Sequence, residues 1–339
     1  MADGTAADFH GAPDRGQVAR LFARGFFVFA VLFALVAAAV GDTFYLRLAT
    51  EALIFGGLAL AVDILLGFTG LLSLGQALFF GYGAYASGLV LKEVAPSFSL
   101  AMGVVLGTAT IFGLIAGVIA IRARGVYFAL ITFGLAQVVS RIVFNVRALG
   151  ASDGLIGIPA IEIDMLVFRI STTDAAGFFL FVLALVLALY LLSAYVMATP
   201  LGRTLVAIRT NEARVPFLGC RPWRYKLAAF VLAADIAALC GALYPMLRGF
   251  VSPELLFFQV SGNAVITVVV GGVGTLIGAL YGSAILTILK SVVGTITEHH
   301  QIVIGLLFVL SVIAFPRGLV GHLGRFAVRA APRKTGGPQ

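Results

Sequence analysis

The densest group of charged side chains lies between positions 200 and 226. There, one acid, Glu212, stands among six basic residues: Arg203, Arg209, Arg214, Arg221, Arg224 and Lys226. In a chain that is otherwise apolar, such a segment can bind a soluble protein through charge and hydrogen bonding. The simpler alternative is a plain basic loop that follows the positive-inside rule of membrane proteins.

Two aspartates, Asp63 and Asp235, lie within apolar runs. A carboxylate in hydrocarbon is costly and usually marks a transport pathway or a paired group. An aspartate facing a pathway would favour a substrate with a positive group, alter gating, or bind a proton or sodium ion. Alternatively, Asp63 caps a helix break before Gly67, and Asp235 pairs with an arginine or a hydroxyl of a neighbouring subunit.

No group of residues predicts enzymatic catalysis. Glu298, His299 and His300 are adjacent, so they do not converge on a metal as the i, i+4 histidines of HExxH do. Cys220 and Cys240 have neither metal-ligand nor disulfide spacing. The chain has no GxxxxGK[ST] phosphate loop, so we expect no ATPase site, metal or cofactor of its own.

The elements that carry these residues are membrane helices. The chain has 339 residues, of which 61% are hydrophobic and 11% charged. Its net charge of +8 lies at the ends of apolar runs, which fits membrane topology better than nucleic-acid binding. We therefore expect an all-α polytopic membrane protein with about ten spans. The expected spans are 25–40, 46–66, 75–91, 100–121, 126–144, 175–196, 227–247, 262–271, 276–293 and 302–315. We expect the first span to be retained and not to be a cleaved signal. The eighth is too short to cross alone.

Even numbers of spans separate the basic segments, which places all of them in the cytoplasm with both termini. These segments are Arg20 with Arg24, Arg122 with Arg124, the segment 200–226, and the tail with Arg325, Arg329, Arg333 and Lys334. The connections 145–174 and 248–261 then face outward. We expect a polar tail at 1–20, a membrane domain at 21–320 and a basic cytoplasmic tail at 321–339.

Two segments, 67–88 and 271–283, are rich in glycine. Such sequences let helices approach closely, or let a helix break where protein or water satisfies its backbone. They occupy corresponding places in a five-plus-five division of the chain, as interrupted helices do in transporters built from internal repeats. Plain helix packing is the alternative for any single glycine.

Several long blocks resemble the permease subunits, of LivM type, of ABC importers for branched-chain amino acids. The blocks are DILLGFTGLLSLGQALFFGYGAYASG, RARGVYFALITFGLAQVV, GASDGLIGIP, GRTLVAIRTNEARVPFLGCRPWRYKLAAFV and VVVGGVGTLIGALYGSAIL. They cover about 51–321 in the family's order and spacing. The resemblance implies three kinds of partner: a second, LivH-type permease, two ATP-binding subunits of LivG and LivF type that use ATP and Mg²⁺, and a periplasmic binding protein. It also implies that the complex lies in a bacterial inner membrane, in contact with lipid, and that it does not bind nucleic acid.

The resemblance also implies functions for particular residues. Coupling to the ATPases is expected from Arg203, Ala207, Arg209, Asn211, Glu212, Ala213 and Gly219. The binding protein is expected to dock at Ser152, Asp153 and Gly154. The predicted topology, and not the resemblance, adds Arg248, Ser252 and Glu254 on the same face as weaker candidates. The pathway is expected to include Gly70, Ser73, Phe80 and Tyr85, together with Gln76, Thr132, Gln137 and Asn263, which are polar residues on neighbouring membrane segments.

Three positions depart from the family pattern. Pro216 is expected to break the coupling helix or end it at Val215. Asp63 and Asp235 stand where the family has neutral residues. They keep open an ion-coupled secondary transporter as the alternative function, and a membrane scaffold without a polar route as a third possibility.

Overall fold

The computed structural model describes residues 15–165, 168–296, 305–306 and 318. Nearly all of the predicted span 302–315 lies outside these residues. So do the predicted tail 321–339 with its four basic residues, and the group Glu298, His299 and His300.

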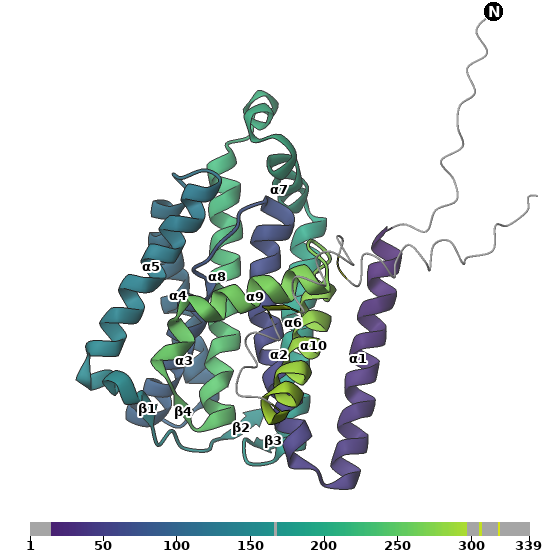
Figure 1. The fold of residues 1–339 in the computed structure, drawn as a ribbon, viewed down its shortest axis with the longest axis vertical. Helices are drawn as coiled ribbons and strands as arrows, with labels where there is room; N and C mark the ends of the chain where they lie inside the picture. The colour runs from purple at the N-terminus through teal and green to yellow at the C-terminus, as the bar shows by residue number, and fades with distance from the viewer. Residues whose placement is uncertain (1–14, 166–167, 297–304, 307–317, 319–339) are drawn as a thin grey trace, which may run out of the picture.

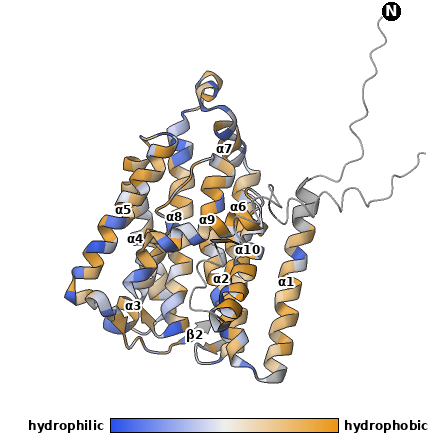
Figure 2. Ribbon diagram, in the orientation of Figure 1, coloured by the Kyte–Doolittle hydropathy of each residue, from blue (hydrophilic) through white to orange (hydrophobic). Residues whose placement is uncertain are grey.

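Within the described residues, seven helices are long and apolar enough to cross a membrane. They are α1 (Arg15–Val40), α2 (Thr43–Asp63) with the π-helix Ile64–Thr69, α4 (Phe98–Ala120), α5 (Val126–Asn145), α6 (Ala175–Ala198), α8 (Pro222–Arg248) and α10 (Ile277–Ile296). Three are shorter: α3 (Gln76–Leu89), followed by the π-helix Val90–Val94, α9 (Phe258–Gly271), and the polar α7 (Pro200–Asn211). The prediction of a polytopic helical membrane protein is confirmed (Figure 2).

Two short antiparallel ribbons interrupt this helical architecture. β1 (Leu155–Ile156) pairs with β4 (Phe250–Val251), and β2 (Glu162–Met165) pairs with β3 (Phe168–Ser171). All four strands lie at one end of the molecule, and α7 lies at the other (Figure 1). The connections 145–174 and 248–261 therefore share an end, as the predicted topology requires.

Helix ends follow local sequence. The Asp42 side chain accepts from Phe44 N at 3.1 Å and caps α2, and Asp174 caps α6 in the same way. Such caps satisfy backbone donors that the first helical turn leaves free. Proline stands at the first position of α7 and of α8, where its missing N–H has no cost.

The core centres on the crossing of α3 and α8, where two glycines allow backbone contact. A Cβ on Gly83 would lie 2.0 Å from the carbonyl oxygen of Ala238, and one on Gly241 would lie 1.9 Å from that of Phe80. By contrast, no atom lies within 4 Å of a Cβ built on Gly103 in α4. The glycine-rich sequence thus serves close helix packing at particular positions.

The first helix, α1, stands at the edge of the bundle (Figure 1). Its Phe26 packs edge-on against Tyr281 of α10, with ring centroids 4.9 Å apart. The Tyr281 hydroxyl donates to the Phe22 carbonyl oxygen at 3.1 Å. These contacts attach α1 to the second half of the chain.

Candidate functional site

The segment 200–226 forms the end of the molecule opposite the strands (Figure 1). It begins with α7 and continues as a 3-10 helix, Glu212–Leu218, that contains Pro216 and ends at Gly219 with φ +75°. The sequence predicts that Pro216 breaks the coupling helix or ends it at Val215; the α-helix is interrupted, but it ends earlier, at Asn211. The tighter 3-10 turn accommodates the proline, and the left-handed conformation suits glycine.

The tip of this segment carries apolar side chains that touch little of the chain. Phe217 is 89% exposed and Leu218 75% exposed, although the segment is polar overall. Among the predicted coupling residues, Arg203, Asn211, Ala213 and Gly219 are exposed and Ala207 is half-buried. The tip therefore offers apolar and basic groups together to a partner outside the described chain.

Arg209 connects α7 to the interior. Its guanidinium Nη1 donates a hydrogen bond to the Gly67 carbonyl oxygen, within the π-helix that ends α2. Its Cγ would lie 3.0 Å from a Cβ on Gly70, a position with φ +73°. Only glycine permits both the backbone conformation and this approach.

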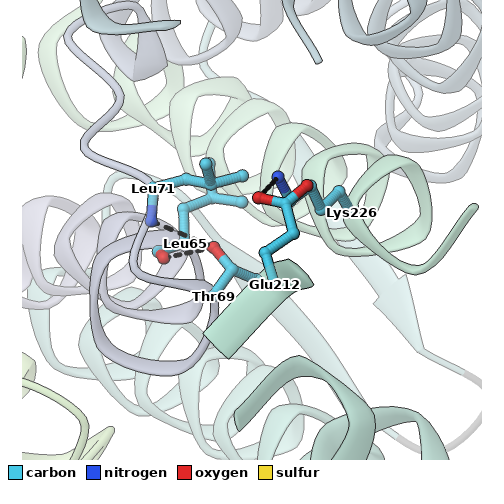
Figure 3. A network of polar contacts seen from close by, with 5 residues as sticks. All are labelled: Leu65, Thr69, Leu71, Glu212 and Lys226. Carbon is cyan, nitrogen blue, oxygen red and sulfur yellow. Dashed lines mark hydrogen bonds and ion pairs between the residues drawn. The ribbon is translucent and has the colours of Figure 1, made fainter. Parts of the chain in front are cut away.

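Glu212 is held within the chain by an ion pair. The Lys226 Nζ donates to Glu212 Oε2 at 2.6 Å, and the Lys226 side chain is 3% exposed against 36% for Glu212. Figure 3 draws this pair together with Leu65, Thr69 and Leu71, and both α7 and α8 contact the π-helix that ends α2. A buried ammonium requires such a partner, because water cannot reach it.

The π-helix leads into a break in the chain. The Thr69 hydroxyl donates to the Leu65 carbonyl oxygen and accepts from Leu71 N at 3.3 Å (Figure 3). Residues 70–75 are then irregular before α3 begins. The interruption predicted in the first glycine-rich segment is confirmed.

Asp63 holds a second break, between α9 and α10. Its carboxylate accepts from Gly274 N at 2.6 Å and from Leu276 N at 2.8 Å, and the residue is fully buried. Leu276 has φ +58°, a conformation that leucine rarely adopts and that needs local support. Asp63 thus caps a helix break, but the break is the distant one at 272–276 and not the one near Gly67.

The two breaks touch. A Cβ on Gly67 would lie 2.6 Å from Gly274 Cα, so position 67 needs glycine, and Gly274 has φ +79°, a conformation that suits glycine. The Arg209 guanidinium, bonded to the Gly67 carbonyl, would lie 3.6 Å from a Cβ on Gly274. We call Asp63, Gly67, Arg209 and Gly274 the junction, because α2, α7 and the α9–α10 break meet there.

Side chains from other helices cap the start of α3. Ala77 N donates to the Ser261 hydroxyl of α9 at 2.8 Å, and Leu74 N donates to Thr132 of α5 at 3.2 Å. Ser73 is buried there as well. Gln76 is fully buried, and both polar atoms of its amide lack a partner among the described residues.

The predicted pathway residues are distributed unevenly. Ser73, Gln76 and Thr132 come together at the start of α3, whereas Gly70 and Asn263 are exposed and Gln137 is half-buried. Phe80 is fully buried and stacks on Phe55 with centroids 5.3 Å apart, and Tyr85 is 4% exposed. In this conformation most of these side chains are in the protein interior.

Asp235 is only half-buried in α8. The Thr110 hydroxyl of α4 donates to its carboxylate at 3.0 Å. A hydroxyl partner was predicted on a neighbouring subunit, but it is supplied by the same chain.

At the opposite end, Ser152 and Asp153 are exposed, and Gly154 backs onto β4, where a Cβ would lie 2.1 Å from the Val251 carbonyl oxygen. Arg248 forms an ion pair with Glu51, with 2.5 Å between Nη2 and Oε2. The pairing of β1 with β4 brings the loop 149–159 beside 248–256. The predicted docking residues thus lie at the same end of the molecule, with Ser152 and Asp153 exposed and Gly154 buried.

Sequence reasoning missed the parts played by Lys226, Ser261, Thr110 and Gly274. Lys226 and Ser261 stand near the starts of apolar helices, where a lone polar residue is a weak signal of a buried contact. No local signal marks Gly274 as the partner of Asp63, since 211 positions separate them.

Comparisons with known proteins agree with these observations. The family model described as "Branched-chain amino acid transport system / permease component" matches residues 44–312. The chain is 29% identical to the high-affinity branched-chain amino acid transport system permease protein LivM of Salmonella typhimurium, and equally to that of Escherichia coli, over 80% of this chain and 69% of each relative. It is 28% identical to Escherichia coli LivH over 40% of this chain and 44% of that relative. No solved structure matched significantly.

Proposed function

The chain belongs to the family of branched-chain amino acid transport system permease components, and from this we propose that it forms half of the translocation pathway for branched-chain or related amino acids. It is a multi-pass permease subunit of an ABC importer of the inner membrane, and a transport subunit rather than an enzyme. Similarity to both LivM and LivH supports pairing of two homologous permeases.

One observation carries the mechanism that we propose: direct contacts run from the exposed segment 200–226 to both helix breaks. Phe217 and Leu218 are exposed at the tip, and Arg209 bonds to the Gly67 carbonyl at the base of the same segment. Gly67 in turn packs against Gly274, which Asp63 holds. A force applied to the tip therefore reaches the interrupted helices without passing through a flexible linker.

In this mechanism, two partner ATPases bind ATP and Mg²⁺, close, and move the segment 200–226. Rigid-body motion of α7 shifts the junction and rocks the helices on either side of the breaks. The binding protein docks at the other end, on Ser152, Asp153 and the β1–β4 ribbon. The substrate then passes between this permease and its LivH-type partner.

The topology that we propose has ten membrane segments: α1, α2, α3, α4, α5, α6, α8, α9, α10 and 302–315. Both termini and the segment 200–226 lie in the cytoplasm, by the positive-inside rule. The two touching breaks support a five-plus-five repeat, because inverted repeats place interrupted helices at their interface.

The alternative, an ion-coupled secondary transporter, receives less support. Both oxygens of Asp63 already accept backbone N–H groups, and Asp235 accepts from Thr110. Both oxygens of Asp63 are thus occupied, and among the described residues no cluster of three or more acidic, histidine or cysteine side chains surrounds either aspartate.

The test is mass spectrometry of the proteins that co-purify with the tagged chain, gently solubilised from its native membrane. We expect two ATPases and a second permease. Phe217→Glu should remove the ATPases while the second permease stays, because a charge at an apolar contact opposes docking. Phe250→Glu, at the opposite end, is the matched control and should retain them.

Absence of any ATPase from an unaltered chain that remains active in uptake would reject the proposal. Attention would then turn to Asp63 and Asp235 as ion-binding groups. Retention of the ATPases by Phe217→Glu would reject only the assigned docking tip.

A further inference from the structure

A cavity of about 440 Å³ opens between the end of α4 and the start of α8. Its lining residues are Gly117, Val118, Ile121, Arg122, Trp223 and Leu227. Four of these six are apolar, and the other two are a guanidinium and an indole. None of them contributes to the junction or to the exposed tip of the segment 200–226.

The lining changes from polar to apolar along both helices in the same direction. Arg122 lies just beyond the end of α4, and Gly117 and Val118 are in its last turn. On the other wall, Trp223 is in the first turn of α8 and Leu227 is one turn deeper. The mouth of the cavity therefore lies at a membrane–water boundary, where tryptophan and arginine side chains concentrate, and its floor lies toward hydrocarbon.

The mouth is positively charged. The Arg224 guanidinium carbon lies 5.6 Å from the centroid of the Trp223 ring. Arg122 and Arg224 are exposed, and neither forms an ion pair within the part of the chain that the structure describes. The nearest acid in sequence to Trp223 is Glu212, and that carboxylate is already paired with Lys226.

We propose that this cavity, which is open as a groove between α4 and α8, binds one anionic phospholipid, with its phosphate on Arg122 and an acyl chain along Val118 and Leu227. A guanidinium binds phosphate through several hydrogen bonds at once. A free phosphate ion would leave the four apolar lining residues uncovered, whereas a lipid covers them with its chain. The same site would discriminate against zwitterionic lipids such as phosphatidylcholine, because the Arg224 guanidinium beside Trp223 would repel their headgroup ammonium.

The chain provides its own reporter for this site, because Trp223 is its single tryptophan. The assembled importer is reconstituted in vesicles of phosphatidylcholine that contain increasing fractions of dibrominated phosphatidylglycerol or dibrominated phosphatidylcholine. Bromine on an acyl chain quenches a tryptophan in contact with it. The difference in fluorescence between this importer and its Trp223→Phe form isolates the signal of Trp223 from tryptophans of the partners.

Brominated phosphatidylglycerol should quench Trp223 at a mole fraction at least about five-fold lower than brominated phosphatidylcholine, since one basic residue near a membrane contributes about 1 kcal/mol of attraction to anionic lipid. Arg122→Gln should remove most of this preference. Arg124→Gln is the matched control, because it removes the same charge from the same turn but does not line the groove. It should retain most of the preference.

Three results would overturn the proposal. Equal quenching by the two lipids would show that the groove does not select charge. Quenching by neither lipid would show that a protein subunit covers the groove. Loss of the preference on adding excess inorganic phosphate would identify an anion site that needs no acyl chain. None of these results depends on whether the importer transports amino acids.

Discussion

The carboxylate of Asp63 accepts a hydrogen bond of 2.6 Å from the backbone N–H of Gly274. This contact joins the end of α2 to the break between α9 and α10, 211 positions away in sequence, and Leu276 N completes it. An aspartate that looks, in sequence, like an ion-binding group thus supports backbone that has left the helix, as buried irregular backbone requires.

Asp63→Asn should destabilise the protein, because an amide has only one acceptor oxygen for two buried N–H donors. The expected loss is about 1–3 kcal/mol, the cost of one unsatisfied buried group. Equilibrium unfolding in mixed micelles measures it. The control is Asp235→Asn, where the new amide oxygen can still accept from Thr110, so the loss should stay under about 1 kcal/mol. A change of substrate profile in Asp235→Asn would instead place that residue in the pathway.

Arg209→Ala should uncouple ATP hydrolysis from transport. The variant keeps the exposed tip of the segment 200–226, so the ATPases should still co-purify, but the bond to the Gly67 carbonyl is lost. We expect uptake of substrate to fall roughly ten-fold, which corresponds to about 1.4 kcal/mol of lost coupling. Arg209→Lys retains a donor and should lose less. Loss of the ATPases from Arg209→Ala would show that Arg209 acts in docking.

Glu212 and Lys226 should show strong coupling in a double-mutant cycle. Glu212→Gln leaves a buried ammonium without its counter-charge, at a cost of roughly 2 kcal/mol for a charged hydrogen bond. Adding Lys226→Met removes that ammonium, so the double variant should recover much of the stability. Purely additive losses in unfolding free energy would mean that the two side chains do not pair.

Gly83→Ala should be far more damaging than Gly103→Ala, although both place a methyl group in an apolar helix. The new Cβ at position 83 would collide with the Ala238 carbonyl, whereas at position 103 it meets open space. We expect about 1–3 kcal/mol of destabilisation at position 83 from overpacking. Yield of folded protein in size-exclusion chromatography, followed by thermal unfolding, compares the two. Equal stability would argue that α3 and α8 do not cross at this glycine.

The sequence predicts the helices well where hydropathy alone decides their ends. The predicted span 126–144 corresponds to α5 (Val126–Asn145), and 175–196 corresponds to α6 (Ala175–Ala198). It also predicts both breaks, because clustered glycines weaken a helix locally. These features depend on residues that are close in sequence, so the sequence of one chain is enough to predict them.

The junction could not be predicted in the same way. The pairing of Asp63 with Gly274, and that of Arg209 with Gly67, depend on how helices pack far from their position in sequence. The resemblance implies that Glu212 contacts the ATPases, and the structure adds that its carboxylate pairs with Lys226 of the same chain. The sequence shows that a charged side chain needs a partner of opposite charge, but only the packing of the helices shows which residue is that partner.

The π-helix Ile64–Thr69 makes the length of this stretch critical. A π-turn accommodates one residue more than an α-turn, so deleting any one residue here would restore a regular helix. That deletion would also remove the widened turn in which the Gly67 carbonyl oxygen accepts from Arg209 and Gly67 packs against Gly274. Among insertions and deletions of one residue, we expect those at 64–69 to abolish transport, whereas those at the exposed connection of Pro96 and Ser97 should be tolerated.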